Sequence, residues 1–252
     1  MKDAFGVEMM NDRKQKTEIE MRNESTSGNK KEQCLKDALA QHEPTFIGMD
    51  QCHQAAVCIP LLKNTAGGYD VLFEVRASTI AHQPGDVCLP GGMVEEGENP
   101  RDAALRELQE ELLLKEEQIC YLGDMDKLYT GSHLIMYSFA VEVTEYQNTF
   151  SQAEVDDVFT VPLEFFLHTE PECYLTRAKV EPGEDFPYEL ICGGREYQWR
   201  SRKEEVYFYQ YEGHVIWGLT AKMMRAFTDV IKGASFYEQK ISALSVEKKT
   251  RT

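Results

Sequence analysis

Three glutamates in the middle of the chain, Glu107, Glu110 and Glu111, have a spacing that gathers carboxylates on one face of a helix. Residues at i, i+3 and i+4 are neighbours on an α-helix. Like charges at this spacing destabilise a helix by roughly 0.2–0.5 kcal/mol per pair, so the arrangement brings an advantage only when a cation binds there. Carboxylate oxygens are hard ligands that suit Mg²⁺ or Mn²⁺. The glutamates therefore indicate a divalent metal site, and the alternative is a solvated acidic helix face.

The neighbouring residues predict the helix that would position these carboxylates. Asn99 can cap its N-terminus, and Pro100 fits its first turn, where the missing N–H has no intrahelical partner. Nothing over residues 102–112 breaks a helix. Its predicted apolar stripe consists of Ala104, Leu105, Leu108 and Leu112.

A longer pattern surrounds this helix. Gly92 is followed after five residues by Glu98, and after seven more by Arg106-Glu107-Leu108-Gln109-Glu110-Glu111. The pattern resembles the Nudix box, the signature of a family of metal-dependent hydrolases. Leu113 stands where the box has a glycine near its end. Because a left-handed conformation costs a leucine about 1–2 kcal/mol, we expect the helix to continue to Lys115 or beyond.

The resemblance implies roles for the charged residues. Glu107, Glu110 and Glu111 would bind Mg²⁺ or Mn²⁺, and either Glu107 or Glu110 would act as the general base. Glu98 would be an auxiliary metal ligand or the ion-pair partner of Arg106, and that arginine would hold the carboxylates in place. Outside the box, Glu154 is a weaker candidate for reaching the metal.

The segment upstream of the box resembles the coenzyme A pyrophosphatase branch of the Nudix family. Residues in register with the branch motif are Leu72, Phe73, Arg76, Ala77, Gly85, Pro90, Gly91 and Gly92. Ala81 replaces the second arginine of the motif, with His82 as the nearest substitute, and Leu89 replaces its phenylalanine. Segments 154–163 and 216–221 also resemble this branch, so the likeness covers about residues 54 to 230.

This second resemblance adds three substrate-binding candidates. Arg76 would meet a substrate phosphate through its planar fork of donors, the alternative being a structural arginine at a strand end. Gly91 and Gly92 would let the backbone pass close to the metal site, or would simply form a tight turn.

Apolar runs elsewhere predict a mixed sheet flanked by helices. Predicted strands lie at residues 55–62, 69–75, 119–123, 134–143 and 206–211, with weaker candidates at 188–192 and 196–199. Short helices are predicted at 31–41 and after Pro162, and a longer one at 221–231. These elements indicate a single domain of the α/β or α+β class, and the resemblance implies the helix–sheet–helix sandwich of the Nudix fold. We expect a disordered tail over 1–30, the domain over 31–235 and a C-terminal tail over 236–252.

The composition limits the partners and the compartment. The formal net charge is −16, and residues 1–31 contribute +1, so the remainder carries −17. Nucleic acid needs a basic footprint and is therefore not an expected partner. An odd number of cysteines, seven, without a C-x-x-C pair indicates free thiols in a reducing compartment. Since no apolar run reaches the length of a membrane span, we expect a cytoplasmic protein, of unknown oligomeric state.

Three functions compete at this point. The first is a metal-dependent hydrolase that cleaves the pyrophosphate of coenzyme A or its thioesters to 3′,5′-ADP and a 4′-phosphopantetheine species. The second is a Nudix hydrolase of another nucleoside diphosphate derivative, such as ADP-ribose or NADH, which the departures at Ala81 and Leu89 favour. The third is a ligand-binding module that has kept the fold and lost turnover.

Overall fold

The computed structural model describes residues 30 and 32–249, with side chains as far as residue 234. It separates the chain into two compact units, residues 1–50 and 51–252. In the first unit, residues 32–40 are helical, as predicted. A 3₁₀ turn, η1 (Met49–Gln51), includes the last two residues of that unit and the first residue of the second. Residues 1–29 of the expected tail lie outside the described residues, and the boundaries at residues 31 and 235 stay predictions.

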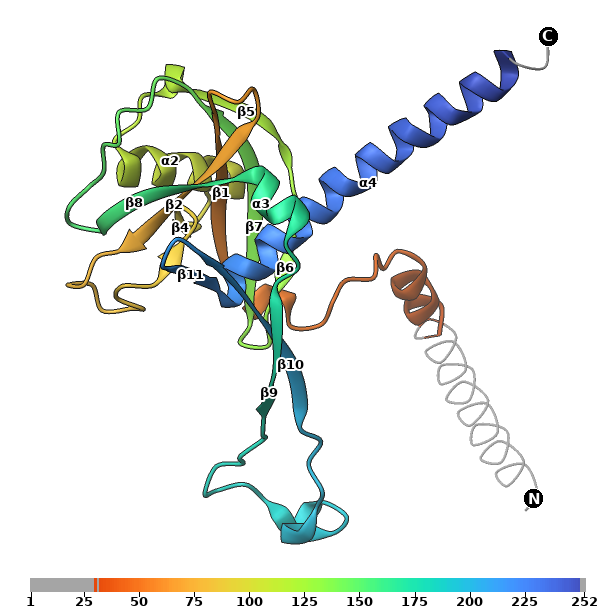
Figure 1. The fold of residues 1–252 in the computed structure, drawn as a ribbon. Helices are drawn as coiled ribbons and strands as arrows, with labels where there is room; N and C mark the ends of the chain where they lie inside the picture. Colours follow the sequence, from red (N-terminus) through yellow and green to blue (C-terminus); the bar gives the residue numbers. More distant parts are fainter. Residues whose placement is uncertain (1–29, 31, 250–252) are drawn as a thin grey trace, which may run out of the picture. The chain divides into compact units, whose positions relative to one another are not determined.

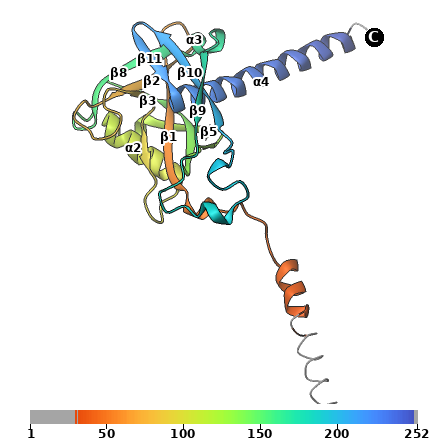
Figure 2. The same cartoon turned by 90° about the horizontal axis from the view of Figure 1, so that it is seen from below.

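The second unit is built on a mixed sheet whose central path runs β3-β2-β1-β7-β5. Figure 1 labels β2, β1, β7 and β5, and Figure 2 labels β3. The bounds along this path are β3 (Val87–Cys88), β2 (Tyr69–Arg76), β1 (His53–Lys63), β7 (Leu134–Val143) and β5 (Ile119–Asp124). β1 and β7 are parallel, and all other pairs are antiparallel. Three further strands pair with β1, β7 and β2 respectively: β4 (Gly91–Met93), β6 (Leu128–Tyr129) and β8 (Val155–Pro162).

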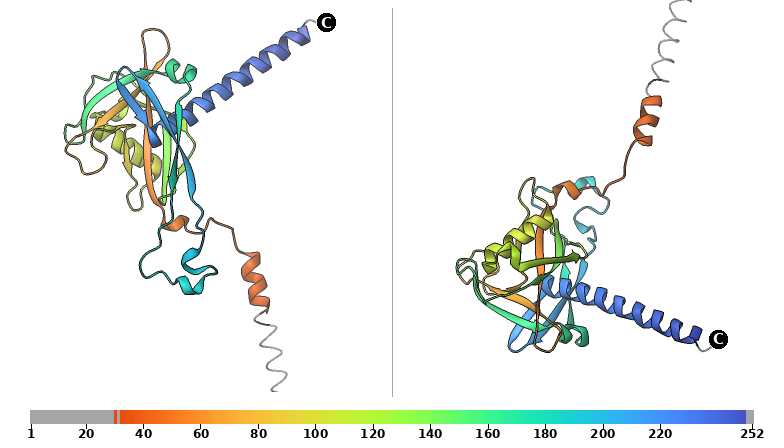
Figure 3. Two further views of the ribbon diagram at one scale, coloured as in Figure 1. Left: turned by 60° about the horizontal axis from the view of Figure 1, so that its bottom comes forward. Right: turned by 90° about the horizontal axis from the view of Figure 1, so that it is seen from above.

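Both faces of this sheet are covered by helices. Side chains alternate along a strand, so Ala56 and Cys58 of β1 pack beneath α2 (Pro100–Leu112), while Val57, Ile59 and Leu61 pack on the opposite side with α4 (Gly218–Lys249). Figures 2 and 3 show the two helices on opposite sides of the sheet. The predicted helix–sheet–helix arrangement is therefore confirmed. A short helix, α3 (Leu163–His168), follows Pro162 as predicted.

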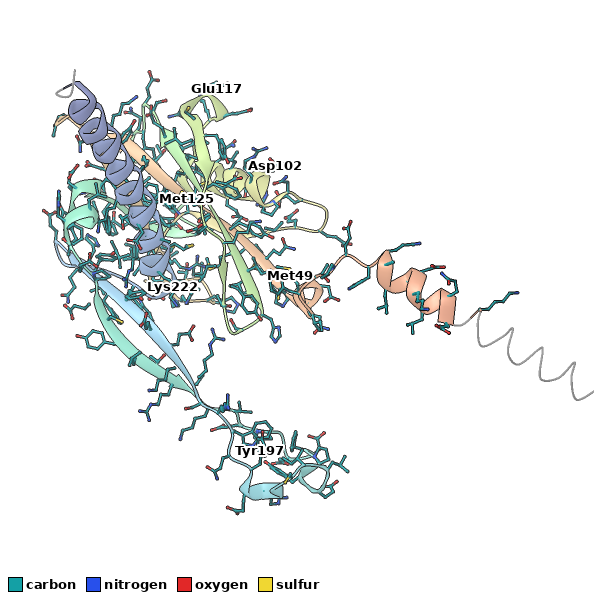
Figure 4. The ribbon with its side chains drawn as sticks, turned by 90° about the vertical axis from the view of Figure 1, so that its right-hand side faces the viewer. Met49, Asp102, Glu117, Met125, Tyr197 and Lys222 are labelled. Atoms are coloured by element: carbon teal, nitrogen blue, oxygen red, sulfur yellow. The ribbon has the colours of Figure 1, made fainter. Side chains whose placement is uncertain are left out.

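A second sheet differs from the prediction. It has the order β11-β10-β9, with β11 (His214–Trp217), β10 (Arg202–Tyr211) and β9 (Glu172–Ala178). β9 was not predicted because all of its side chains are exposed, so its sequence lacks an apolar alternation. The strand candidates at 188–192 and 196–199 are wrong, since this region forms the 3₁₀ turns Tyr188–Leu190 and Gly194–Glu196. Its aromatic residues pack on one another near Tyr197 (Figure 4) instead of into a sheet.

α4 also differs from the prediction, because it continues past Ile231 to Lys249. No proline lies between those residues to stop it. Among the described helices, none combines the length and the hydropathy that crossing a bilayer requires.

The end of α2 corrects the expectation for Leu113. The helix stops at Leu112, and Leu113 adopts the left-handed conformation, with φ 54° and ψ 41°. Its neighbours hold it there: the buried Leu114 donates its N–H to the Gln109 carbonyl at 3.1 Å, and Thr149 Oγ1 donates to the Leu112 carbonyl at 2.8 Å. Packing and hydrogen bonds on both sides thus outweigh the local preference of a leucine.

We predict that Leu113→Gly stabilises the protein relative to Leu113→Ala by about 1 kcal/mol, since only the β-carbon is strained in the left-handed region. Both variants remove the leucine side chain beyond the β-carbon, and Leu113 is 56% exposed. Urea denaturation midpoints measure the difference. Equal midpoints would show that Leu113 carries no backbone strain.

Candidate functional site

Most of the predicted site residues lie on two adjacent elements, α2 and β4, whereas Glu98 precedes α2 and Arg76 ends β2. The N-terminus of α2 is capped as expected, because the Asn99 side chain accepts the Arg101 N–H at 2.9 Å. β4 pairs with β1 and places Gly91 and Gly92 beside the helix. Small residues make this approach possible: Ala56, Cys58, Ala103 and Ala104 are all fully buried between β1 and α2.

Arg106 gathers three of the predicted carboxylates around one guanidinium. It donates to both oxygens of Glu98, at 3.0 and 3.2 Å, to Glu107 Oε1 at 2.8 Å and to Glu110 Oε2 at 3.3 Å. The hydrogen bond from Arg106 lowers the pKa of Glu98. Partial burial raises the pKa of Glu107, although Arg106 opposes that effect. Glu98 was predicted to be either an auxiliary metal ligand or the ion-pair partner of Arg106, and the structure contains the ion pair.

Glu111 points to the other side and meets a residue that the motif does not contain, Glu74 of β2. Only 5% of Glu111 and 1% of Glu74 is exposed. Glu111 Oε2 accepts the Gly91 N–H at 2.8 Å, and Glu74 Oε1 accepts the Cys88 thiol at 3.2 Å. Burial, reinforced for Glu111 by the charge of Glu74, raises the pKa of both carboxyls. Two buried acids this close favour a shared proton over two charges.

The sequence contained a signal for Glu74 that the motif did not include. Glu74 is the single charged residue within the buried run Val71–Glu74, on the same face as the buried Leu72. An acid on a core face needs a partner or a function. Glu154 also belongs to this neighbourhood, because its charge raises the pKa values of Glu74, Glu107 and Glu111.

The two glycines are required for different contacts. A β-carbon at Gly92 would lie 2.4 Å from Glu107 Oε1, so the absence of a side chain lets this carboxylate lie against the strand. At Gly91, where φ is +154°, a β-carbon would lie 2.3 Å from the carbonyl oxygen of Ala56. Gly92 therefore provides a close approach to a site carboxylate, and Gly91 allows the pairing of β4 with β1.

Arg76 lies at the edge of this group. Its Nε donates to the His82 carbonyl at 3.2 Å, and its charge lowers the pKa of Glu74. The two departures from the upstream motif are placed differently: Leu89 is a core residue, 3% exposed, whereas Ala81 is exposed. Leu89 thus keeps the apolar role of the phenylalanine, but Ala81 supplies no charge.

The donor set fits a divalent cation. Within the described part of the chain, no three acidic, histidine or cysteine side chains already form a metal cluster. Arg106 instead donates to Glu98, Glu107 and Glu110. However, Glu74 Oε2 is buried without a hydrogen-bond partner. A divalent cation bound to these carboxylates would offset the repulsion between their charges, so that the buried carboxyls would not need a proton. Oxygen ligands of this kind suit Mg²⁺ or Mn²⁺.

The buried pair predicts a pH dependence of stability in EDTA. Because the native-state pKa values of Glu74 and Glu111 are raised, the native state holds more protons than the unfolded chain above the ordinary carboxyl pKa near 4.5. Stability therefore falls as pH rises, by about 1.4 kcal/mol per pH unit for each extra proton. Glu74→Gln should make this fall shallower between pH 5 and 8, measured by urea denaturation.

The matched control for that experiment is Glu117→Gln, which alters an exposed glutamate. Its curve of stability against pH should parallel that of the unmodified protein. If the Glu74→Gln curve is parallel as well, the buried carboxyls do not share a proton.

Comparisons with known proteins agree with this geometry. The NUDIX domain model matches residues 53–186, which is more than half of the chain. A peroxisomal coenzyme A diphosphatase of Mus musculus is 30% identical over 167 residues, covering 60% of this chain and 66% of that protein. Nudix hydrolase 22, chloroplastic, of Arabidopsis thaliana is 29% identical over 198 residues, covering 74% and 59%.

A peroxisomal coenzyme A diphosphatase of Caenorhabditis elegans is 33% identical over 118 residues, covering 45% of this chain and 50% of that protein. The matched segments thus span from half to two thirds of these three relatives. The domain match contains β4, α2, Glu74 and Glu154, which belong to the candidate site. By this match, the chain belongs to the Nudix family.

Proposed function

We propose that the protein is a metal-dependent hydrolase that cleaves the pyrophosphate of coenzyme A or its thioesters. The observation that carries the proposal is the group of carboxylates that gathers around α2 and β4. Arg106 holds Glu98, Glu107 and Glu110 in place, and Gly92 lets Glu107 approach the strand. Relatives named as coenzyme A diphosphatases support the choice of substrate. The net charge of −16 disfavours nucleic acid as a partner.

Glu107, Glu110 and Glu111 would bind Mg²⁺ or Mn²⁺, with Glu98 as auxiliary ligand or as the anchor of Arg106. When bound, the cation lowers the pKa of a water molecule and neutralises charge on the diphosphate. Either Glu107, which is half-buried, or Glu110, which is exposed, accepts the proton of the attacking water. Water adds its oxygen to one phosphorus, and the bridging oxygen departs with the other phosphoryl group. Coenzyme A then gives 3′,5′-ADP and 4′-phosphopantetheine.

Arg76 is the proposed phosphate ligand, because it stands next to Glu74 with N–H groups beyond the one that meets His82. The second candidate function, hydrolysis of ADP-ribose or NADH, is favoured by a specific feature: Ala81 supplies no second positive charge for the 3′-phosphate that distinguishes coenzyme A. A module without turnover would have little reason to keep these carboxylates together, since their repulsion weakens the fold.

All seven cysteines lie in the described part of the chain, and they are present as thiols. This is consistent with a reducing compartment, and we retain the cytoplasm as the proposed location. The names of the relatives include peroxisomal and chloroplastic proteins, so imaging of the tagged full chain in its own cells is the appropriate measurement.

We predict that Glu110→Gln lowers hydrolysis by about 10²-fold or more, because the residue loses both a ligand charge and a proton acceptor. The assay incubates purified protein with Mg²⁺ or Mn²⁺ and, separately, coenzyme A, ADP-ribose and NADH. Chromatography then resolves the products. We expect 3′,5′-ADP to appear from coenzyme A ahead of any other product.

Glu117→Gln, which changes an exposed glutamate outside the site, should keep full activity. Full activity of a folded Glu110→Gln variant would refute the proposed site. Turnover of ADP-ribose or NADH in preference to coenzyme A would support the second candidate function.

A further inference from the structure

A pocket of about 400 Å³ lies on the opposite side of β2 and β3 from the carboxylates. The two sites are linked through consecutive residues. Glu74 of β2 and Cys88 of β3 contact each other on the α2 side. Val75, which follows Glu74, and Val87, which precedes Cys88, line the pocket. Because side chains alternate along a strand, one layer of backbone separates the pocket from the site.

Aromatic rings with fixed orientations form one wall of this pocket. Trp217 of β11 stacks on Phe208 with an interplanar angle of 12° and a centroid distance of 5.8 Å. His214 stacks on Phe159 with an angle of 10° at 3.7 Å. Trp217 is nevertheless 40% exposed, so part of its surface is available to a ligand. Rings held in this way are suited to stacking against a planar heterocycle.

The one carboxylate among the described lining residues, that of Asp86, indicates which heterocycle the pocket would bind. Asp86 is half-buried, and its carboxylate has no hydrogen-bond or ion-pair partner among the described residues. None of the described residues that line the pocket is a lysine or an arginine. A phosphate would therefore be repelled, while an exocyclic amino group could donate to Asp86. Arg76, which follows the pocket residue Val75 in β2, instead exerts its charge on Glu74 at the carboxylate site.

We propose that this pocket binds the nucleobase of the substrate, with Trp217 as the stacking surface and Asp86 as the acceptor of the amino group of adenine. Its volume lies within the range of small-ligand sites. A nucleotide would place its base here and direct its phosphates past Arg76 toward the carboxylates. This inference rests on the proposed function only in taking a nucleotide as the substrate.

The two tryptophans of the chain, Trp199 and Trp217, allow a direct test by fluorescence. In the double variant Trp199→Phe/Glu110→Gln, Trp217 is the sole tryptophan and turnover is suppressed. Titration with ADP should quench its fluorescence to saturation, whereas inorganic pyrophosphate, which has no base, should not. In the matched variant Trp217→Phe/Glu110→Gln, the remaining Trp199 should not respond to ADP.

Calorimetry gives the affinity independently. Trp217→Ala should weaken ADP binding by about 5- to 150-fold, the range for loss of one base–aromatic stack. Trp217→Phe should retain most of the affinity, and Trp199→Ala should retain all of it. Asp86→Ala should reduce the preference for ADP over inosine diphosphate, which lacks the amino group, toward unity.

Several outcomes would overturn the inference: no binding of ADP, binding without a response of Trp217, an equal response to pyrophosphate, or unchanged affinity in a folded Trp217→Ala variant. Urea denaturation of that variant verifies that it is folded. These measurements do not depend on turnover, so they can fail while the product assay succeeds. Conversely, ADP can bind in this pocket even if coenzyme A is not cleaved.

Discussion

The structure of this site depends on how repulsion between crowded carboxylates is balanced. On the exposed side of α2, a single guanidinium, that of Arg106, forms ion pairs with Glu98, Glu107 and Glu110 and offsets part of their mutual repulsion. On the buried side, Glu111 and Glu74 lie close together with only the charge of Arg76 acting on Glu74 in their favour, and burial raises the pKa of both carboxyls, which favours a shared proton over two charges. Both arrangements leave the oxygens clustered around β4. A divalent cation is the one ligand that can substitute for the arginine contacts and for the proton together.

This balance requires α2 to be held firmly against the sheet. Alanine and cysteine side chains, with no bulk to separate the layers, fill the contact between α2 and β1, and the Cys58 thiol donates to the Ala104 carbonyl at 3.4 Å. At its C-terminal end, α2 is fixed by hydrogen bonds from Thr149 and from the Ser151 N–H to its last carbonyls. This packing and these hydrogen bonds therefore hold the backbone beneath the carboxylates in place and keep them close together.

Local sequence predicted the elements whose residues follow a regular period. The strands β1, β2, β5, β7 and β10 and the helix α2 carry an apolar pattern or a cap, and the Nudix box gives the carboxylates of α2. Elements whose state depends on distant partners were missed. β9 is exposed throughout and becomes a strand only by pairing with β10, and Leu113 takes a conformation that tertiary contacts impose. Glu74 could not be assigned either, because its meaning depends on Glu111, which approaches only after the sheet and helix pack.

The alternation of side chains along β2 has an evolutionary consequence. Glu74 belongs to the chemistry on one face and Val75 to the pocket on the other, so a single-residue insertion or deletion in this strand would exchange the two environments at once. Such a change would place an acid among the aromatic rings and a valine among the carboxylates. Point substitutions, by contrast, reach one face at a time. Descendants of this chain are therefore free to alter what they recognise one residue at a time, provided that the length of β2 is preserved.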